Sequence, residues 1–539
     1  MKPANPSPQL HPNQRLVMTY DAGETPCGPA DAEAQIRSLV RCFEGTHVGI
    51  LQRHIGAIKA YQQSEVLEIN DVQAPWLEAG VDPMTVFVDE CHRCGMEAWG
   101  SRRMGDAHHT YEILEYEKSQ SQFYKDHPEL RLKWKRDVQV APKYDWNKPE
   151  IAAQNLAFLR EVAEGYGVDG IDLDFTRIPP WFNEGEEAQG RETMNQHLRD
   201  LRAMLDEVGD RKGKRLGLSV QLYHRDSLWK AERSDLRHEG TRNKSMDLET
   251  EQDDITAHFD AGLDVRSWVN EGLIDLLNAH SRNTSLYEMD ISAWKQAVAG
   301  SSCRLVAGPG KPGFFVERRG GFVDGYPAHL TRPLEHRAVA HRLYLQGADG
   351  LAFYDYVIRF FDLQWDVFRE LGDPERLRGA NKTYVFQLFL PLDLGMRDEG
   401  RTTWMPIDLP EDLGSARASG DSVDVRLLLN VSELVTPEDL LLRVNDEDIP
   451  VRRERDVTTP LATTDHPGDT PGCHLETTVP CEILRRGRNE LAFTVRAAAV
   501  RPAGVHPQPC VLHKVHLEVT YRDETYPYWL AMQLDQRRL

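Results

Sequence analysis

Apolar and polar residues alternate in two distinct patterns along this chain. From Leu16 to Tyr356, short runs with the two-residue period of a β-strand alternate with amphipathic stretches that have the 3.6-residue period of a helix. The expected strands are Leu16–Gly23, His47–Gln52, a third beginning at Met96, Val168–Pro180, Leu216–His224, Ile274–His280, Arg304–Gly308 and Gly347–Tyr356, and the expected helices are Ala30–Phe43, Asp82–Gly95, Pro149–Tyr166, Arg191–Val208, Asp264–Glu271 and Pro333–Gln346. This alternation predicts an α/β fold, a closed parallel (β/α)8 TIM barrel.

The pattern changes near Asn381, after which helical periodicity gives way to short apolar or alternating runs separated by turn residues. These runs are Phe386–Leu390, Val423–Val431, Leu440–Val444, His474–Val479, Glu490–Val495 and Leu512–Tyr521. Such spacing is typical of an antiparallel β-sandwich. We therefore expect two domains, a catalytic barrel over residues 1–380 and an accessory β-sandwich over residues 381–539.

The length of 539 residues suits such a two-domain chain. The net charge of -21 restricts the classes of partner that the chain can bind. A field of this sign repels nucleic acids and anionic membranes, so we expect neither as a partner. No apolar run is long enough to span a bilayer, and the N-terminus lacks the apolar core of a signal peptide. The expectation is a cytoplasmic protein, although a chain whose leader has been removed would have the same sequence. A homo-oligomer is compatible with the sequence.

Cofactor motifs are absent from the sequence. No Gly-x-Gly-x-x-Gly or Walker-type Gly-Lys-Ser/Thr motif follows an expected strand, so no nucleotide cofactor is expected. The eight cysteines are scattered, which favours reduced thiols. Cys91 and Cys94 form a lone Cys-x-x-Cys in an expected helix, which we interpret as packing, with metal binding or redox chemistry as the alternative.

The strand Val168–Pro180 carries the clearest chemical signal. Asp172 and Asp174 share one face of it, opposite an apolar face. In a barrel whose apolar side chains lie under the helices, both acids point inward, and Asp174 lies near the mouth, where barrel enzymes place their catalytic groups. We expect a structural role for Asp172 or a contact to substrate, and catalysis for Asp174.

Hydrolysis of a glycosidic bond needs two acids, one to protonate the leaving oxygen and one to attack the sugar or activate water. Asp174 is the first candidate. The second is left open by the sequence, with Asp106 after the third strand and Asp355 after the eighth as leading candidates, ahead of Glu24 and Asp226.

Further polar side chains cluster at expected strand ends and are candidates for binding substrate. They are Asp172, Arg103, His108, His109, Arg177, Tyr223, His224, Arg225, His280 and Tyr354. The arginines suit hydroxyl, carboxylate or sulfate groups of a glycan, and equally suit a role in neutralising the nearby aspartates. The histidines are expected to form hydrogen bonds in the pocket, and would bind a metal only if several converged.

The run Asp169–Phe175 resembles the strand signature of glycoside hydrolases with barrel folds. It departs from the chitinase pattern, because Thr176 stands where that pattern has its glutamic acid. A wider set of segments is similar to the family-ten-like glycosyl hydrolase group of bacterial barrels and covers most of residues 15–360: Arg103–Asp106 with His108 and His109, Val168–Arg177, Gly262–Val265 with Trp268, and Gly347–Gly350. The resemblance implies a barrel glycosidase with a trailing sandwich.

The sequence thus predicts a glycoside hydrolase that cleaves a poly- or oligosaccharide, including an acidic or modified one, with carboxylates at the barrel mouth. Its carbohydrate substrate is the only partner we expect, with neither metal nor cofactor. Two alternatives stay open: a metal-dependent hydrolase on the same barrel, and a non-catalytic carbohydrate-binding protein.

Overall fold

This computed structural model describes residues 15–20, 28–105, 120–133, 143–176, 180–224, 253–280, 287–310, 332–354, 365–386, 392–395, 400–421, 423–432, 439–457, 472–496 and 509–521. The chain divides into two compact units. We name them the barrel unit, residues 1–283, 290–311 and 347–372, and the sandwich unit, residues 284–289, 312–346 and 373–539. The chain passes between them more than once, and the expected division at residue 380 stays a prediction.

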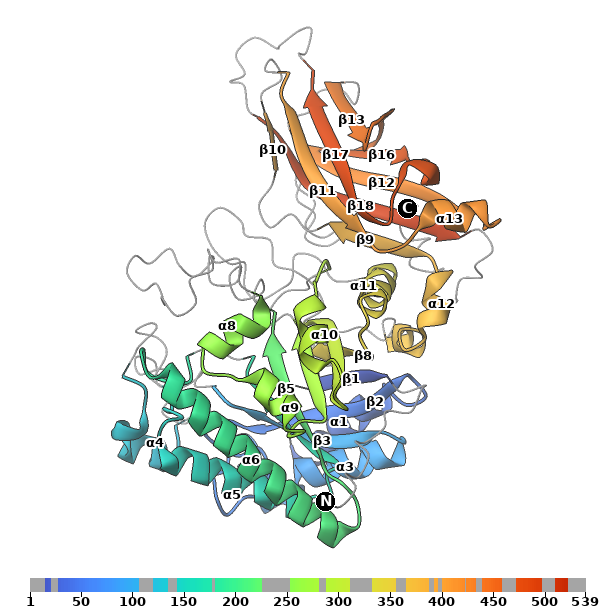
Figure 1. The fold of residues 1–539 in the computed structure, drawn as a ribbon. Helices are drawn as coiled ribbons and strands as arrows, with labels where there is room; N and C mark the ends of the chain where they lie inside the picture. Colours follow the sequence, from blue (N-terminus) through green and yellow to red (C-terminus); the bar gives the residue numbers. More distant parts are fainter. Residues whose placement is uncertain are drawn as a thin grey trace. The chain divides into compact units, whose positions relative to one another are not determined.

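Eight parallel strands close into a barrel in the order of the sequence, which confirms the predicted fold class (Figure 1). They are β1 (Leu16–Tyr20), β2 (Val48–Gly56), β3 (Glu97–Arg103), β4 (Gly170–Asp174), β5 (Gly217–Tyr223), β6 (Leu276–His280), β7 (Arg304–Gly310) and β8 (Gly350–Tyr354). The helices of this unit are α1 (Pro29–Arg41), α2 (Ala74–Glu78), α3 (Pro83–Arg93), α4 (Gln122–Asp126), α5 (Pro149–Gly165), α6 (Glu187–Lys212), α8 (Asp254–Asp260), α9 (Val265–Asn270) and α10 (Ser292–Val298). The described part of this unit also has 3-10 helices at Pro128–Leu130 and Trp365–Arg369.

Aromatic packing closes one end of the barrel interior. Trp99 on β3 packs in a buried cluster with side chains from five other strands. Its indole ring occupies the space above two glycines, because a Cβ atom would lie 2.5 Å from the ring at Gly170 and 2.3 Å from it at Gly217. The two glycines therefore make room for the largest side chain of the interior.

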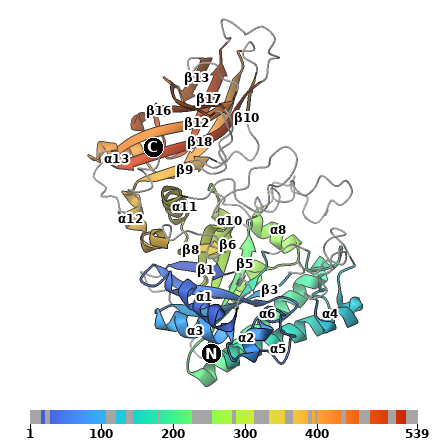
Figure 2. The same ribbon diagram turned by 180° about the vertical axis from the view of Figure 1, so that it is seen from behind.

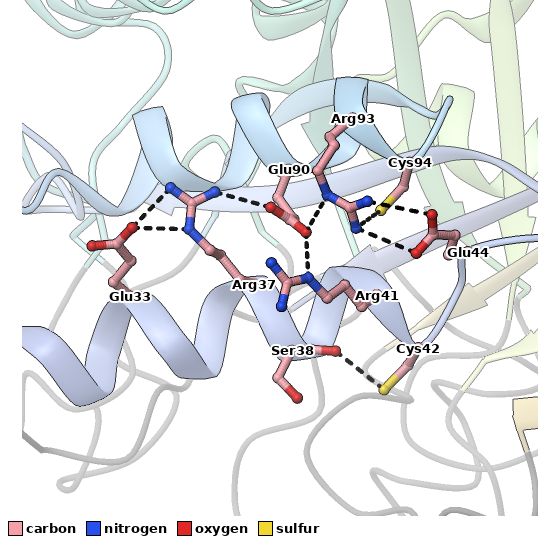
Figure 3. Close-up of polar contacts among 9 residues, drawn as sticks. All are labelled: Glu33, Arg37, Ser38, Arg41, Cys42, Glu44, Glu90, Arg93 and Cys94. Atoms are coloured by element: carbon pink, nitrogen blue, oxygen red, sulfur yellow. Dashed lines mark hydrogen bonds and ion pairs between the residues drawn. The ribbon is translucent and has the colours of Figure 1, made fainter.

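A network of charged side chains joins α1 to α3 on the outside of the barrel (Figure 3). Glu90 of α3 is 1% exposed and accepts hydrogen bonds from Arg37 and Arg41 of α1 at 2.9 and 2.6 Å, and from Arg93 at 2.7 Å. Burial alone would raise the pKa of Glu90, but the three guanidinium groups outweigh it and lower the pKa to about 2. Beside this network, Cys94 accepts a hydrogen bond from Arg93, and Cys91 is buried.

The sandwich unit contains two antiparallel sheets, as predicted. One sheet has the order β10-β18-β12-β16-β15, with β9 also paired to β18, and the other has the order β11-β17-β13-β14 (Figure 2). The strands are β9 (Lys382–Phe386), β10 (Leu392–Gly395), β11 (Thr402–Leu409), β12 (Val423–Ser432), β13 (Leu440–Val444), β14 (Glu447–Ile449), β15 (Arg452–Val457), β16 (Gly472–Thr478), β17 (Gly487–Val495) and β18 (Cys510–Tyr521). Apolar side chains of both sheets, such as Leu429 of β12 and Phe493 of β17, form one core.

Among its described residues, the sandwich unit has the helices α11 (Pro333–Leu345), α12 (Pro374–Arg378) and α13 (Leu413–Ala418), with a 3-10 turn at Cys481–Ile483. Helix α11 packs against β9, and Ala338 of α11 is part of the sandwich core. This helix lies between β7 and β8 in the sequence, so the sandwich unit uses a segment that interrupts the barrel. In the part of the chain that is described, no helix has the length and apolar character needed to cross a bilayer.

Candidate active site in the barrel

The interior of the barrel changes from apolar to polar along its strands. One layer consists of Val17, Ile50, Trp99, Leu276, Val306 and Ala352. Two residues further along their strands stand Thr19, Gln52, Ser101, Asn278 and Tyr354, and two further again stand His54, Arg103 and His280. The C-terminal ends of the strands, where barrel enzymes carry out their chemistry, therefore have a polar interior.

Amide and hydroxyl side chains in the middle of the barrel bond to one another across β1, β2 and β5. The Oε1 atom of Gln52 accepts from the hydroxyl of Thr19 at 2.8 Å and from Nε2 of Gln221 at 2.9 Å. In turn, Nε2 of Gln52 donates to the hydroxyl of Ser219 at 3.0 Å. All four residues are buried, so these bonds satisfy groups that would otherwise be costly to remove from water.

Asp172 of β4 lies in this network and is fully buried. It accepts hydrogen bonds from the hydroxyl groups of Ser101 and Ser219 and from Nε2 of Gln221. Burial raises the pKa of Asp172 to about 7, aided by the negative charge of Asp174 and opposed by the hydrogen bonds. Its hydrogen bonds join β3, β4 and β5.

Asp174, the last residue of β4, is held by neighbours from its own loop and from β2. Its Oδ1 accepts from the backbone N–H of Thr176 at 2.7 Å and from the Thr176 hydroxyl at 2.5 Å. Its Oδ2 lies 3.3 Å from Nε2 of His54, and both side chains are fully buried. Hydrogen bonds donated to a carboxylate favour its ionised form, whereas full burial disfavours it.

Three of the predicted binding residues, on β3, β6 and β8, meet inside the barrel at the C-terminal ends of their strands. Arg103 donates to the hydroxyl of Tyr354 at 3.3 Å. The Tyr354 ring stacks on His280 with ring centres 5.4 Å apart, and meets His54 edge-on at 6.4 Å. His280 in turn lies 3.0 Å from Oε1 of Gln221. Arg103 is also paired in register with Asp174, so these side chains and the carboxylate share one end of the barrel.

Two other predicted residues, Tyr223 and His224, contact α8. The Tyr223 ring lies edge-on to His258, with centres 4.8 Å apart, and its carbonyl lies 3.0 Å from Nε2 of that histidine. Nε2 of His224 lies 3.4 Å from Asp254, which also accepts from Trp294 at 2.8 Å. The structure thus places these two side chains in a polar contact between β5 and α8.

The remaining candidates lie outside the described residues: Asp106, His108, His109, Arg177, Arg225 and Asp355, as do Glu24 and Asp226. Within the described ranges, no three His, Cys, Asp or Glu side chains converge as a metal site requires. A cavity of about 20 Å³ adjoins the end of β3 and is lined by Arg103, Met104, Lys143 and Tyr144 among others. It has room for about one water molecule.

His54 was not among the predicted site residues, although it is the side chain paired with Asp174. The prediction ended the second strand at Gln52, whereas β2 continues to Gly56. The signal for the longer strand is the alternation Ile50, Gln52, His54, which keeps the histidine on the inward face.

No protein-family model matches this sequence, and no curated protein matches it either. Solved structures resemble it only distantly. An alpha-L-fucosidase isoenzyme 2 from Paenibacillus thiaminolyticus has a TM-score of 0.41 and 12% identity, over 67% of this chain and 48% of that one. A cycloisomaltooligosaccharide glucanotransferase from Paenibacillus sp. has a TM-score of 0.32 and 10% identity, over 94% and 58% of the two chains. A maltogenic alpha-amylase from Thermotoga neapolitana has a TM-score of 0.36 and 11% identity, over 90% and 99%. This chain spans about half the length of the first two structures. Likeness of this degree says nothing about activity.

Proposed function

We propose that this chain is a glycoside hydrolase in which Asp174 is one of two catalytic carboxylates. The observation that supports it is the position of Asp174, an acid at the C-terminal end of a barrel strand with His54 and Thr176 as polar neighbours. A buried acid in such surroundings is typical of a functional site. Because Asp174 is fully buried, substrate can contact it only if neighbouring atoms move.

The contacts of Asp174 favour the role of nucleophile or general base. Thr176 donates two hydrogen bonds to Oδ1, which stabilise the ionised carboxylate and fix its orientation. His54 then acts as a positioning residue on the side of Oδ2. The proton donor would be a second acid, and Asp106 and Asp355 are the candidates because they follow β3 and β8, whose last residues Arg103 and Tyr354 are hydrogen-bonded to each other.

Substrate binding is assigned to the polar side chains at the same strand ends. Arg103, His280 and Tyr354 present a guanidinium group, an imidazole and a phenol, which suit the hydroxyl groups of a poly- or oligosaccharide. Membership in the family-ten-like glycosyl hydrolase group belongs to the same proposal and rests on the sequence segments that resemble it.

The decisive test is Asp174→Asn, assayed on a panel of oligosaccharides and aryl glycosides. We expect kcat to fall about 10²–10⁴-fold while the circular dichroism spectrum and Tm stay unchanged, because the variant loses an ionisable group and little volume. Asp349→Asn is the matched control, since Asp349 caps the opposite end of the barrel by accepting from the backbone of Leu305.

Activity of Asp174→Asn close to that of the unsubstituted chain would remove the residue from catalysis. Binding of a glycan without turnover in either protein would favour the non-catalytic carbohydrate-binding alternative. Activity lost in EDTA and restored by zinc would favour the metal-dependent hydrolase.

A further inference from the structure

The sandwich unit contains a cavity far larger than the one beside β3. Its volume is about 690 Å³, within the range of small-molecule binding sites. It is lined by residues of α11, α12 and α13 and by Tyr521 at the end of β18, all parts of the sandwich unit. Its floor is buried, with His341 and Glu411, while its rim carries exposed side chains such as Ser419 and Arg486. A ligand can therefore enter from solvent.

The floor of this cavity is organised around the carboxylate of Glu411. Tyr384 donates its hydroxyl to Glu411 at 2.7 Å, and Tyr521 donates at 3.4 Å. Nζ of Lys382 lies 3.3 Å from Glu411, and Nδ1 of His341 lies 3.6 Å from it. Burial and the positive charge of Lys382 lower the pKa of His341 to about 3, so the imidazole is neutral at physiological pH. The floor is thus preorganised, with each charge held in place.

The charges around the cavity offset one another. Glu411 is paired with Lys382, and Glu375 on the rim is paired with Arg378 at 3.2 Å. Asp412 is the N-cap residue of α13, and its carboxylate accepts hydrogen bonds from the backbone N–H and the hydroxyl of Ser415. Because these carboxylates already have hydrogen-bond or ion-pair partners, they attract a cationic ligand only weakly. An anionic ligand is disfavoured as well, because the acidic residues that line the cavity outnumber its two arginines. In the described residues no acidic side chains converge as a metal ligand set.

A neutral molecule rich in hydroxyl groups suits this lining best. Hydroxyl groups donate to carboxylates and accept from guanidinium groups, so a lining that carries both, together with serine hydroxyls, can form hydrogen bonds with the hydroxyl groups of a sugar. The half-buried ring of Tyr521 adds an apolar surface of the kind that packs on sugar rings.

We propose that the sandwich unit binds a neutral saccharide in this cavity, as a second site separate from the carboxylates of the barrel. The choice of a saccharide over other neutral polyols rests on the proposed glycoside hydrolase function. The site holds the glycan without cleaving it.

The experiment uses the full chain carrying Asp174→Asn, so that the saccharide probes are not hydrolysed. Binding is measured by isothermal titration calorimetry with three neutral probes, maltotetraose, cellotetraose and xylotetraose, and with the anionic tetragalacturonic acid. Ser419→Trp, at the C-cap of α13, fills the cavity from its exposed rim. Ala418→Trp, at the last residue of α13 and outside the cavity lining, is the matched control. Arg486→Ala is a second variant, which removes a rim side chain and cannot overpack the unit. We expect a neutral probe to bind, with affinity reduced at least about tenfold by Ser419→Trp, reduced by Arg486→Ala, and unchanged by Ala418→Trp.

The inference is overturned if no neutral probe binds, if binding is insensitive to both cavity variants, or if tetragalacturonic acid binds more tightly than every neutral probe. Turnover is measured separately with Ser419→Trp in the otherwise unsubstituted chain on a small aryl glycoside, and we expect it unchanged. If saccharide binding depends on Ser419 but the unsubstituted chain shows no turnover, the proposed glycoside hydrolase function is contradicted and the saccharide site in the sandwich unit is still supported.

Discussion

Asp172 and Asp174 lie two residues apart on one face of β4, and their neighbours give the two carboxyl groups different properties. Asp172 is enclosed by Ser101, Ser219 and Gln221, and burial raises its pKa to about 7. Asp174 stands at the strand end beside His54. The sequence predicts both acids and their shared face, but it cannot supply the serine and glutamine partners, which come from other strands and depend on the barrel register.

The raised pKa of Asp172 makes a prediction about stability and pH. Between about pH 4 and pH 7 the carboxyl group of Asp172 is protonated in the folded chain and ionised in the unfolded chain. The contribution of Asp172 to the free energy of unfolding is therefore fully present below pH 4 and is lost as the pH rises through 7. In Asp172→Asn this loss disappears. Urea unfolding at a series of pH values should show a shallower decline from pH 4 to pH 7 than in the unsubstituted chain, and parallel profiles would refute the assignment.

Gly217 provides a second prediction for a single residue. A Cβ atom there would lie 2.3 Å from the indole ring of Trp99, so Gly217→Ala forces the ring or β5 to move. Overpacking of this kind costs about 1–3 kcal/mol, measured as the change in the urea midpoint at constant slope. Gly165→Ala is the control because no atom lies within 4 Å of its Cβ position, and we expect no loss of stability from it.

At the scale of elements, the alternation of apolar residues predicts most strands and helices, and it fails where side chains break the pattern. β2 is predicted too short because Arg53 and His54 are polar, yet both are buried in the barrel. β11 is absent from the prediction because Pro406 interrupts it. This proline is tolerated because β11 is an edge strand paired only with β17, where a missing N–H costs no ladder bond.

The contact between α1 and α3 gives a prediction at the same scale (Figure 3). The pKa of Glu90 is lowered to about 2 from an ordinary value near 4.5, so its stabilising effect is present above pH 4.5 and is lost as the pH falls toward 2. Glu90→Gln removes the charge that holds Arg37, Arg41 and Arg93. We expect about 2 kcal/mol lower stability at pH 7 and a smaller difference from the unsubstituted chain at pH 3, measured by urea unfolding. An equal difference at both pH values would contradict this role.

At the scale of the whole molecule, the polar end of the barrel was predicted from strand ends alone, because parallel strands place their C-terminal residues at one mouth. This reasoning found Arg103, His280 and Tyr354, which the structure brings near Asp174. It could not find the cavity around Glu411, because α11, α12, α13 and β18 are distant in the sequence and only the folded sandwich unit brings them together.

The assignment of α11 to the sandwich unit predicts how the chain tolerates truncation. Residues 1–372 retain all eight barrel strands and also α11, but lose β9 and the core against which Ala338 packs. Arg337 likewise loses the carbonyl of Asn381, to which it donates at 3.2 Å. We expect this shortened chain to expose apolar surface, bind a hydrophobic dye and aggregate, as light scattering would show. A monomer with the Tm of the full chain would show that α11 needs no partner.

The position of Trp99 has a kinetic consequence. In the part of the chain that the structure describes, its indole fills the base of the barrel interior, so under the proposed function a sugar would reach Asp174 from the C-terminal ends of the strands. Under the proposed function, product and substrate occupy the same site beside Asp174, so each excludes the other. We expect product inhibition to be competitive for that reason, and widening the base would not relieve it.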